Sequence, residues 1–299
     1  MEQNYNLKIG YSATALCYTL WGFQPLYWNL CGWADTFFMM ASRVVWASVF
    51  CLILLKIQGK LPEFVAAVKD RKLFLREAAA SLFLMADWLI YLIAIRGGAV
   101  LETSLGYYIE PFVVFFFGAL IYHEKIEKRH ILVLAVILLG IAFSVTGFGR
   151  LPVITVSLAL CFSVYAAIKK GLEIDSIVST SIEICLCAPL AILYIIFFCR
   201  GEGGIASLNL PRLFLVLGAG VVTAVPMLFY SIGLKNLPMF TVGIMQYISP
   251  TLGIVCAVIM GESLTAGKIL SFLLILIGVI IYLDTTFKAE RKIQNEQQI

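Results

Sequence analysis

Charged residues are scarce in this chain: they make up only 13% of its 299 residues, whereas a soluble domain carries about 25%. Hydrophobic residues reach 61% and gather in long runs. One aqueous core could not bury so much apolar surface, so the composition excludes secreted, cytosolic and disordered proteins. The chain is therefore predicted to be a polytopic membrane protein, organised as one membrane domain over residues 1–299.

Residues that hold metals or nucleotides are few as well. The two histidines, His123 and His130, share one loop and lack the companions of a metal centre. Segment Gly261–Lys268 has the wrong glycine spacing for a phosphate-binding loop, and Ile269 replaces the required Ser or Thr. The formal net charge of +4 is too small to indicate nucleic acid. We expect no metal, no cofactor, no nucleotide or nucleic-acid partner and no enzymatic activity.

A helix that crosses the hydrocarbon needs about 20 mostly apolar residues. The segments that fit this length are 8–29, 36–56, 73–95, 99–121, 131–149, 152–168, 176–198, 213–234, 239–260 and 268–284. The connections between them are short, so any chemistry is expected within the bundle. The predicted fold class is an all-α polytopic membrane protein with ten transmembrane helices.

The basic residues predict the orientation. An even number of crossings puts both termini on one side, and most lysines and arginines fall there. The opposite side has Arg96, Arg150, Arg200, Arg212 and Lys268. Because basic loops favour the cytoplasm, we predict a multi-pass protein of the plasma (inner) membrane with cytoplasmic N- and C-termini.

The chain also repeats itself. Trp88–Pro111 aligns with Met227–Pro250 without a gap. The predicted units, 8–149 and 152–284, each hold five crossings, so the second enters the membrane from the opposite face. Such inverted repeats occur in secondary transporters, where they support alternating access.

Several short strings carry a resemblance to a known family. They are Leu20-Trp21-Gly22, Ser42–Trp46, Ser104–Pro111, Gln246–Leu252 and Gly261-Glu262. In these strings the chain resembles the RarD-type branch of the EamA family, within the drug/metabolite transporter (DMT) superfamily. The resemblance implies a ten-helix inner-membrane carrier with a central cavity and leaves its cargo open. It also implies asparagine where this chain has Asp87 and Glu110.

Four ionisable residues stand at membrane depth, away from the ends of the predicted crossings: Arg43, Asp87, Glu110 and Glu183. A charge at this depth costs roughly 2.5–3.5 kcal/mol on insertion scales, so it faces the bundle interior and has a partner or a function. Arg43, the one cation among them, either forms a permanent ion pair or anchors an anionic substrate. At least one acid then lacks a cation and is a candidate proton carrier, with Glu110 first. The alternative for Glu110 is an acid kept protonated by a hydrogen bond to Tyr107 or a carbonyl.

Polar strips mark equivalent helices of the two predicted units. Glu110 shares a helix face with Tyr107, and the equivalent strip of the ninth crossing includes Gln246 and Ser249. Coincident strips on inverted partners suit a cavity at the membrane midplane. The predicted substrate and proton pathway consists of Arg43, Asp87, Glu110, Glu183, Tyr91, Tyr107, Tyr108, Gln246, Tyr247, Ser249, Trp21 and Tyr165.

Two prolines and a loop glutamate complete the set of candidate positions. Pro111 and Pro250 each remove a backbone donor, and the freed carbonyls either line the cavity and help gating or merely accompany a packing kink. Trp21 and its repeat mate Tyr165 are expected in the cavity wall. Glu124 precedes the next crossing and is expected to cap exposed helix amides.

The predicted function is secondary transport of small polar or amphipathic organic molecules by alternating access, with a proton as the candidate coupling ion. One alternative is an integral membrane enzyme acting on lipids or lipid-linked substrates, which would need catalytic groups near the membrane surface. Another is a membrane sensor or assembly factor that transports nothing. Substrate identity, direction of flow and oligomeric state stay open.

Overall fold

The computed structural model describes residues 6–96, 100–124 and 153–260, together with the isolated positions 131, 135, 273, 277 and 280. Within these residues the regular structure is helical throughout. Apart from the isolated positions, the predicted fifth and tenth crossings lie outside the described residues, as does Gly261-Glu262. The count of ten crossings therefore stays a prediction.

The helices of the first predicted unit follow the predicted crossings closely. They are α1 (Leu7–Leu30), α2 (Thr36–Ile57), α3 (Leu61–Lys69), α4 (Arg71–Arg96) and α5 (Val100–Ile121). The sequence interpretation treated 57–72 as a connection and missed α3, because its nine residues are too few to cross a membrane. Pro62 lies in the first turn of α3, where its missing N–H costs nothing.

The second predicted unit contains one deviation from the prediction. Its helices are α7 (Val153–Lys170), α8 (Ser176–Phe198), the short 3-10 helix η1 (Ile205–Ser207), α9 (Leu210–Asn236), α10 (Met239–Met245) and α11 (Ile248–Ile259). The predicted ninth crossing, 239–260, is thus interrupted by a turn at Gln246 and Tyr247.

Side-chain caps explain where several helices begin. Oδ1 of Asp35 accepts hydrogen bonds from the backbone N–H groups of Phe37 (2.9 Å) and Phe38 (3.1 Å) at the start of α2. Asp175 does the same for α8. These contacts satisfy amides that the helix itself leaves unpaired.

Three of the described helices are long and apolar enough to cross a membrane: α2, α8 and α9. Together with the composition of the whole chain, they mark a membrane protein.

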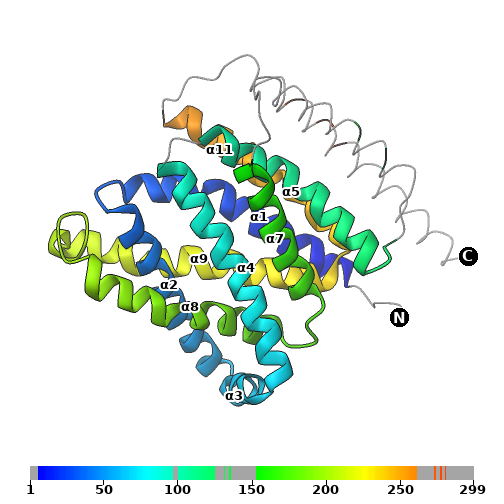
Figure 1. Cartoon of the computed structure of the whole chain (residues 1–299), viewed down its shortest axis with the longest axis horizontal. Coiled ribbons are helices and arrows are strands. Elements are labelled where there is room, and N and C mark those ends of the chain that lie inside the picture. The colour runs from blue at the N-terminus through cyan, green and yellow to red at the C-terminus, as the bar shows by residue number, and fades with distance from the viewer. Residues whose placement is uncertain are drawn as a thin grey trace, which may run out of the picture.

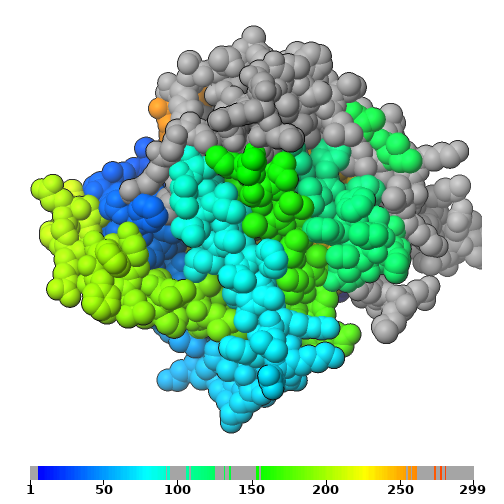
Figure 2. Space-filling model, viewed as in Figure 1, coloured from blue at the N-terminus to red at the C-terminus, as the bar shows by residue number. Residues whose placement is uncertain are grey.

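The helices of the two predicted units are interleaved. Helix α1 packs against α9 and α11, and α2 packs against α8 and α9. Reciprocally, α7 packs against α4 and α5, and α8 against α2 and α4. Figure 1 shows α4, α5 and α7 next to one another, and Figure 2 shows α4 (cyan) beside α7 (green) on the face toward the viewer. Most helix contacts of the described chain therefore run between the units.

Small residues permit this close packing. A Cβ atom added to Gly220 of α9 would clash with the carbonyl carbon of Trp46 and lie 2.6 Å from the backbone nitrogen of Ala47 in α2. Lipid tails are as apolar as the helix surfaces, so the hydrophobic effect does not drive these helices together. Close backbone packing and interhelical hydrogen bonds hold them together instead. One such bond runs from Nε2 of Gln24 to the carbonyl of Val222, 2.8 Å away.

Candidate functional site

The contact between Glu110 and Gln246 joins the two predicted units inside the bundle. Nε2 of Gln246 donates a hydrogen bond of 2.6 Å to Oε1 of Glu110. Both side chains are buried, and Glu110 is only 1% exposed. No cation forms an ion pair with Glu110 among the described residues. The sequence predicted both residues as pathway residues, and the structure brings them into direct contact.

The helix break lies next to this contact. Gln246 ends α10 and Tyr247 precedes α11; both keep helical backbone dihedrals, so the break is a local loss of helical hydrogen bonds at the position of this polar side chain. A Cβ atom added to Gly243 would lie 3.1 Å from the carbonyl of Pro111, so α10 approaches the α5 backbone closely. Interrupted membrane helices place polar backbone and side chains where solutes bind in many carriers.

Arg43 of α2 is stacked on aromatic rings. Its guanidinium carbon lies 4.2 Å from the ring centroid of Trp88 and 5.7 Å from that of Trp28. No ion pair to an acid is present for Arg43 among the described residues, and its Nε is buried without a hydrogen-bond partner there. Stacking on the ring faces stabilises the cation and leaves the N–H donors, which lie in the plane of the guanidinium, available for a hydrogen-bond acceptor.

Asp87 and two tyrosines complete this group. Asp87 precedes Trp88, is 2% exposed, and has one carboxyl oxygen without a partner in the described part of the chain. The rings of Tyr91 and Tyr107 are 5.9 Å apart. Arg43 lies within electrostatic range of Asp87 and of both tyrosines, and Asp87 within range of Glu110. We call Arg43, Asp87, Tyr107, Glu110 and Gln246 the polar centre.

Trp21 and Tyr165 lie in an aromatic cluster beside the polar centre. The ring of Trp21 lies 6.2 Å from Phe162 and 5.5 Å from Tyr230, and Tyr165 stacks on Tyr230 at 6.1 Å. Tyr18 packs against Trp21 at 5.6 Å. The tyrosines of this cluster are fully or almost fully buried, so they fill the interior between α1, α7 and α9.

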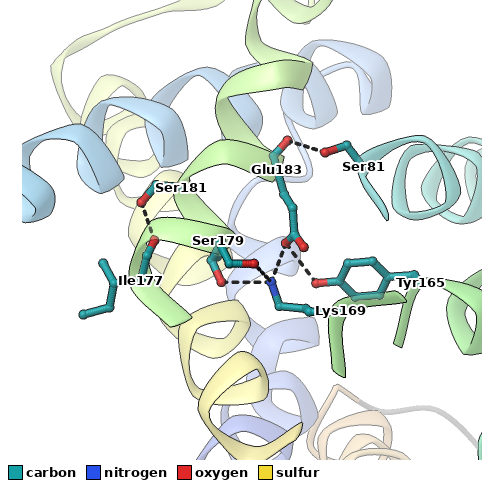
Figure 3. Close-up of polar contacts among 8 residues, drawn as sticks. Ser81, Tyr165, Lys169, Ile177, Ser179, Ser181 and Glu183 are labelled. Atoms are coloured by element: carbon teal, nitrogen blue, oxygen red, sulfur yellow. Dashed lines mark hydrogen bonds and ion pairs between the residues drawn. The ribbon is translucent and has the colours of Figure 1, made fainter. Parts of the chain in front are cut away.

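Glu183 belongs to a different cluster. Its Oε2 forms an ion pair of 2.7 Å with Nζ of Lys169 and accepts a hydrogen bond of 3.2 Å from the Tyr165 hydroxyl. Lys169 also donates to Oγ of Ser179 and Oγ1 of Thr180, each at 3.3 Å. Figure 3 shows Lys169 between Ser179 and Tyr165, with Glu183 above it. The predicted proton carrier Glu183 therefore has a cationic partner.

This ion pair corrects one prediction. The sequence indicated Arg43 as the one cation inside the bundle. Lys169 and Lys170, at the end of α7, are buried as well, with 1% and 6% exposed. Lys170 donates to the carbonyls of Leu237 (2.7 Å) and Leu234 (3.2 Å). Carbonyls at a helix C-terminus carry partial negative charge, which explains why this lysine can be buried there.

Glu124 caps α10, a helix far from it in sequence. Its carboxylate accepts hydrogen bonds from the backbone N–H groups of Met239 (2.7 Å) and Phe240 (3.2 Å), at the start of α10. Nζ of Lys170 lies 3.6 Å away. The expected capping role thus acts across the two predicted units.

The remaining predicted residues lie in α5 or at the start of α11, and they differ in burial and in helix position. Tyr247 is buried and Ser249 half-buried, next to the break. Pro111 lies inside the continuous helix α5, whereas Pro250 is in the first turn of α11, just after the break; the Gln246 carbonyl, which a non-proline residue at 250 could bind, accepts from the N–H of Ser249 instead. The side chain of Tyr108 lies outside what the structure describes.

Sequence reasoning missed two side chains of these clusters. Glu77 stands beside the charged start of α4, so its position indicated the membrane surface, yet it is fully buried. The helical stripe of Glu77, Ser81 and Leu84, all buried, is the signal that could have found it. Trp88 was missed because an aromatic residue in an apolar run carries no distinguishing pattern.

Comparison with known proteins identifies the class. The sequence profile of the EamA-like transporter family matches residues 8–146 and 152–283. The chain therefore belongs to the EamA-like transporter family and is a membrane transporter.

The relatives confirm the resemblance to the RarD-type branch. An uncharacterized transporter of Pseudomonas aeruginosa is 31% identical, covering 96% of this chain and 97% of the relative. The uncharacterized transporter YojE of Bacillus subtilis is 30% identical, covering 97% and 98%. Protein RarD of Escherichia coli is 26% identical, covering 92% and 94%. A solved crystal structure shares the fold, with a TM-score of 0.73 at 17% identity over 92% of this chain and 97% of that one.

Proposed function

We propose that this protein is a secondary carrier of small anionic organic molecules, working by alternating access around the polar centre. The contact between Glu110 and Gln246 supports this most strongly, because it joins the central helices of both predicted units beside a helix break. A shift of one unit against the other would separate or rebuild this contact. The polar centre would then face one side of the membrane or the other.

Two observations support the inverted repeat on which this mechanism depends. The family profile matches two ranges that agree with the predicted units. The helix contacts are also reciprocal: α1 packs on α9 and α11, while its counterpart α7 packs on α4 and α5. A two-fold relation between the units accounts for both.

Arg43 supports an anionic group on the substrate. The two tryptophan rings hold the guanidinium in place, and no acid forms an ion pair with it in the described chain. A carboxylate or phosphate would supply the missing acceptor through bidentate hydrogen bonds. The adjacent aromatic cluster would accommodate an apolar or aromatic part of the same molecule.

Protons are the coupling ion that the acids suggest. Asp87 and Glu110 are buried within electrostatic range of each other, and neither forms an ion pair among the described residues. A proton on either acid would relieve the repulsion between them. We place the protein in the plasma membrane with both termini in the cytoplasm, as the distribution of basic residues favours.

Ligand-induced stabilisation tests the proposed substrate class. Purified protein would be melted with a panel of small carboxylates and phosphates and with their amide or alcohol analogues, because a bound ligand raises the melting temperature. We expect anionic members alone to stabilise the protein, and Arg43→Ala to lose the response. If neutral analogues stabilise equally well, the anionic class is wrong, while carrier function stands. The melting temperature of Arg43→Ala without ligand must be measured first.

Transport in proteoliposomes tests the coupling. Uptake of the best ligand should respond to an imposed pH gradient in the wild type and lose this response in Glu110→Gln. A wild type that transports without responding to the gradient would exclude proton coupling and leave facilitated transport.

A further inference from the structure

Glu77 is a buried acid outside the polar centre. It lies in α4, and its side chain is 0% exposed. Neither carboxyl oxygen has a hydrogen-bond partner among the described residues. An ionised carboxylate in this position would have lost its water and gained no donor in hydrogen-bond geometry, the nearest being the Ser179 hydroxyl, which Lys169 already contacts; this is far more costly than burying a neutral acid.

The nearby cation is already engaged. The charges that act on Glu77 are Glu183 of α8, Lys169 of α7 and Lys235 near the end of α9. Lys169 donates to Glu183 at 2.7 Å, and its other two bonds go to hydroxyl oxygens of α8, as Figure 3 shows. Lys235 is half-buried and forms no ion pair with Glu77.

Among the described residues, the other helices packed against α4 supply no compensating charge at this point, since Lys170 of α7 is bound to the carbonyls of Leu234 and Leu237. The charged residues Glu63 and Lys69 of α3 are exposed. Glu110 of α5 belongs to the polar centre and is bound to Gln246. Glu77 and Glu183 are therefore both within electrostatic range of one fully buried lysine, Lys169, whose ion pair is with Glu183.

We propose that Glu77 is a proton-binding site that controls the partner of Lys169. Glu77 holds a proton while Lys169 is paired with Glu183. When the O–H bond of Glu77 breaks, the proton leaves to water and Lys169, still an ammonium ion, moves from Glu183 toward the new carboxylate. The Lys169–Glu183 ion pair breaks and one between Lys169 and Glu77 forms, while Glu183 keeps the hydrogen bond from the Tyr165 hydroxyl; no other covalent bond changes.

The consequence concerns how the two predicted units are joined. Lys169 and Glu183 both belong to the second unit, whereas Glu77 belongs to the first. The protonated site keeps the ion pair within the second unit, and the ionised site places it between the units. This inference goes beyond the proposed carrier function and does not depend on the substrate or on Glu110.

Infrared spectroscopy of the full-length protein in lipid nanodiscs tests the site without transport. The carbonyl stretch of a protonated carboxylic acid is separate from the carboxylate stretches. Near neutral pH, the wild-type spectrum minus that of Glu77→Gln should contain a carboxylic-acid band, which is lost at alkaline pH. The exposed acid Glu63 is the matched control, since Glu63→Gln should remove carboxylate bands only.

Two results would overturn the proposal. A difference spectrum with carboxylate bands near neutral pH would mean that Glu77 is ionised and balanced by Lys235 or by a metal cation. A band that responds to added sodium at constant pH would mean that sodium is the ligand.

Two further variants or measurements test the link to Lys169 and guard against misfolding. In Glu183→Gln, Lys169 is released to Glu77, so the acid band of Glu77 should be lost; its persistence would contradict the exchange.

In thermal melting, the wild type should lose stability as pH rises, because unfolding releases the proton of Glu77. Glu77→Gln should lose less stability over the same range, and identical pH profiles would contradict proton binding.

Discussion

Arg43 is stabilised inside the bundle by tryptophan rings rather than by an acid of the described chain. Its guanidinium carbon lies 4.2 Å from the Trp88 ring, within the range of a cation–π contact. Such contacts contribute about 2 kcal/mol when desolvated. A planar guanidinium can stack and still offer in-plane donors, whereas a lysine ammonium cannot.

Replacing Arg43 by lysine should therefore impair binding although the charge is kept. We expect Arg43→Lys to bind the anionic ligand about tenfold more weakly, equivalent to about 1.4 kcal/mol, as measured by calorimetry. Lys56→Ala, at the exposed end of the same helix, is the control and should bind as the wild type does. Unchanged affinity of Arg43→Lys would show that charge alone anchors the ligand.

Individual residues of the polar centre could be predicted because a charge in an apolar run stands out. Arg43, Asp87 and Glu110 were found in this way, and Gln246 through alignment of the two units. Which acid pairs with which cation was not predictable, since it depends on how α4, α7 and α8 meet. The Lys169–Glu183 pair is an example, because the sequence places Lys169 at a helix end next to a basic loop.

At the level of helices, hydropathy predicted most of the described crossings to within a few residues. Hydropathy alone did not predict the break between α10 and α11, because Pro238–Met260 contains no charge, but the sequence analysis had named Pro250, four residues after Gln246, as a position that frees a backbone carbonyl. The closest packing is likewise made by backbones, as at Gly220.

Gly220→Ala tests the close packing of α2 and α9. The added methyl group would meet the backbone of Trp46 and Ala47, which cannot move as a side chain can. Overpacking costs about 1–3 kcal/mol, so the melting temperature should fall. Gly253→Ala in α11 is the matched control, since its Cβ meets no described atom within 4 Å; an equal loss in both variants would contradict the packing argument.

The start of α8 should be sensitive to acid. Partial burial alone would raise the pKa of Asp175, but hydrogen bonds from Lys60 Nζ (2.7 Å) and from the N–H groups of Val178 and Ile177 lower it below its usual value. A carboxylate with a lowered pKa stabilises the fold above its unfolded pKa and loses this contribution as pH falls through the folded one.

Asp175→Asn should therefore melt below the wild type at neutral pH, and this difference should shrink in acid. Asparagine still caps a helix, so the variant isolates the charge. Asp70 caps α4 in the same manner and forms no ion pair among the described residues; Asp70→Asn should show a smaller effect. A difference that is constant with pH would exclude the ion pair with Lys60 as its source.

For the whole molecule, the interleaved packing of the two predicted units is the basis of the proposed transport cycle. In the described part of the chain, the helices of each unit contact the other unit more extensively than their own, so a change in one is transmitted directly to the polar centre. Glu124 and Lys170 connect the units at one end of the bundle, where α5, α7, α9 and α10 meet. Sequence alignment predicted two inverted units, but their interleaved packing and the contacts that join them could be seen only in three dimensions.

Cysteine labelling from both sides of the membrane tests the central claim most directly. Ser249, half-buried beside the helix break, would be replaced by cysteine in a background without the eight native cysteines. We predict that a membrane-impermeant maleimide labels Ser249→Cys when added to either side of sealed vesicles. Gly201→Cys, in the exposed loop after α8, should be labelled from one side alone. Labelling of Ser249→Cys from one side only, or from neither, would contradict alternating access.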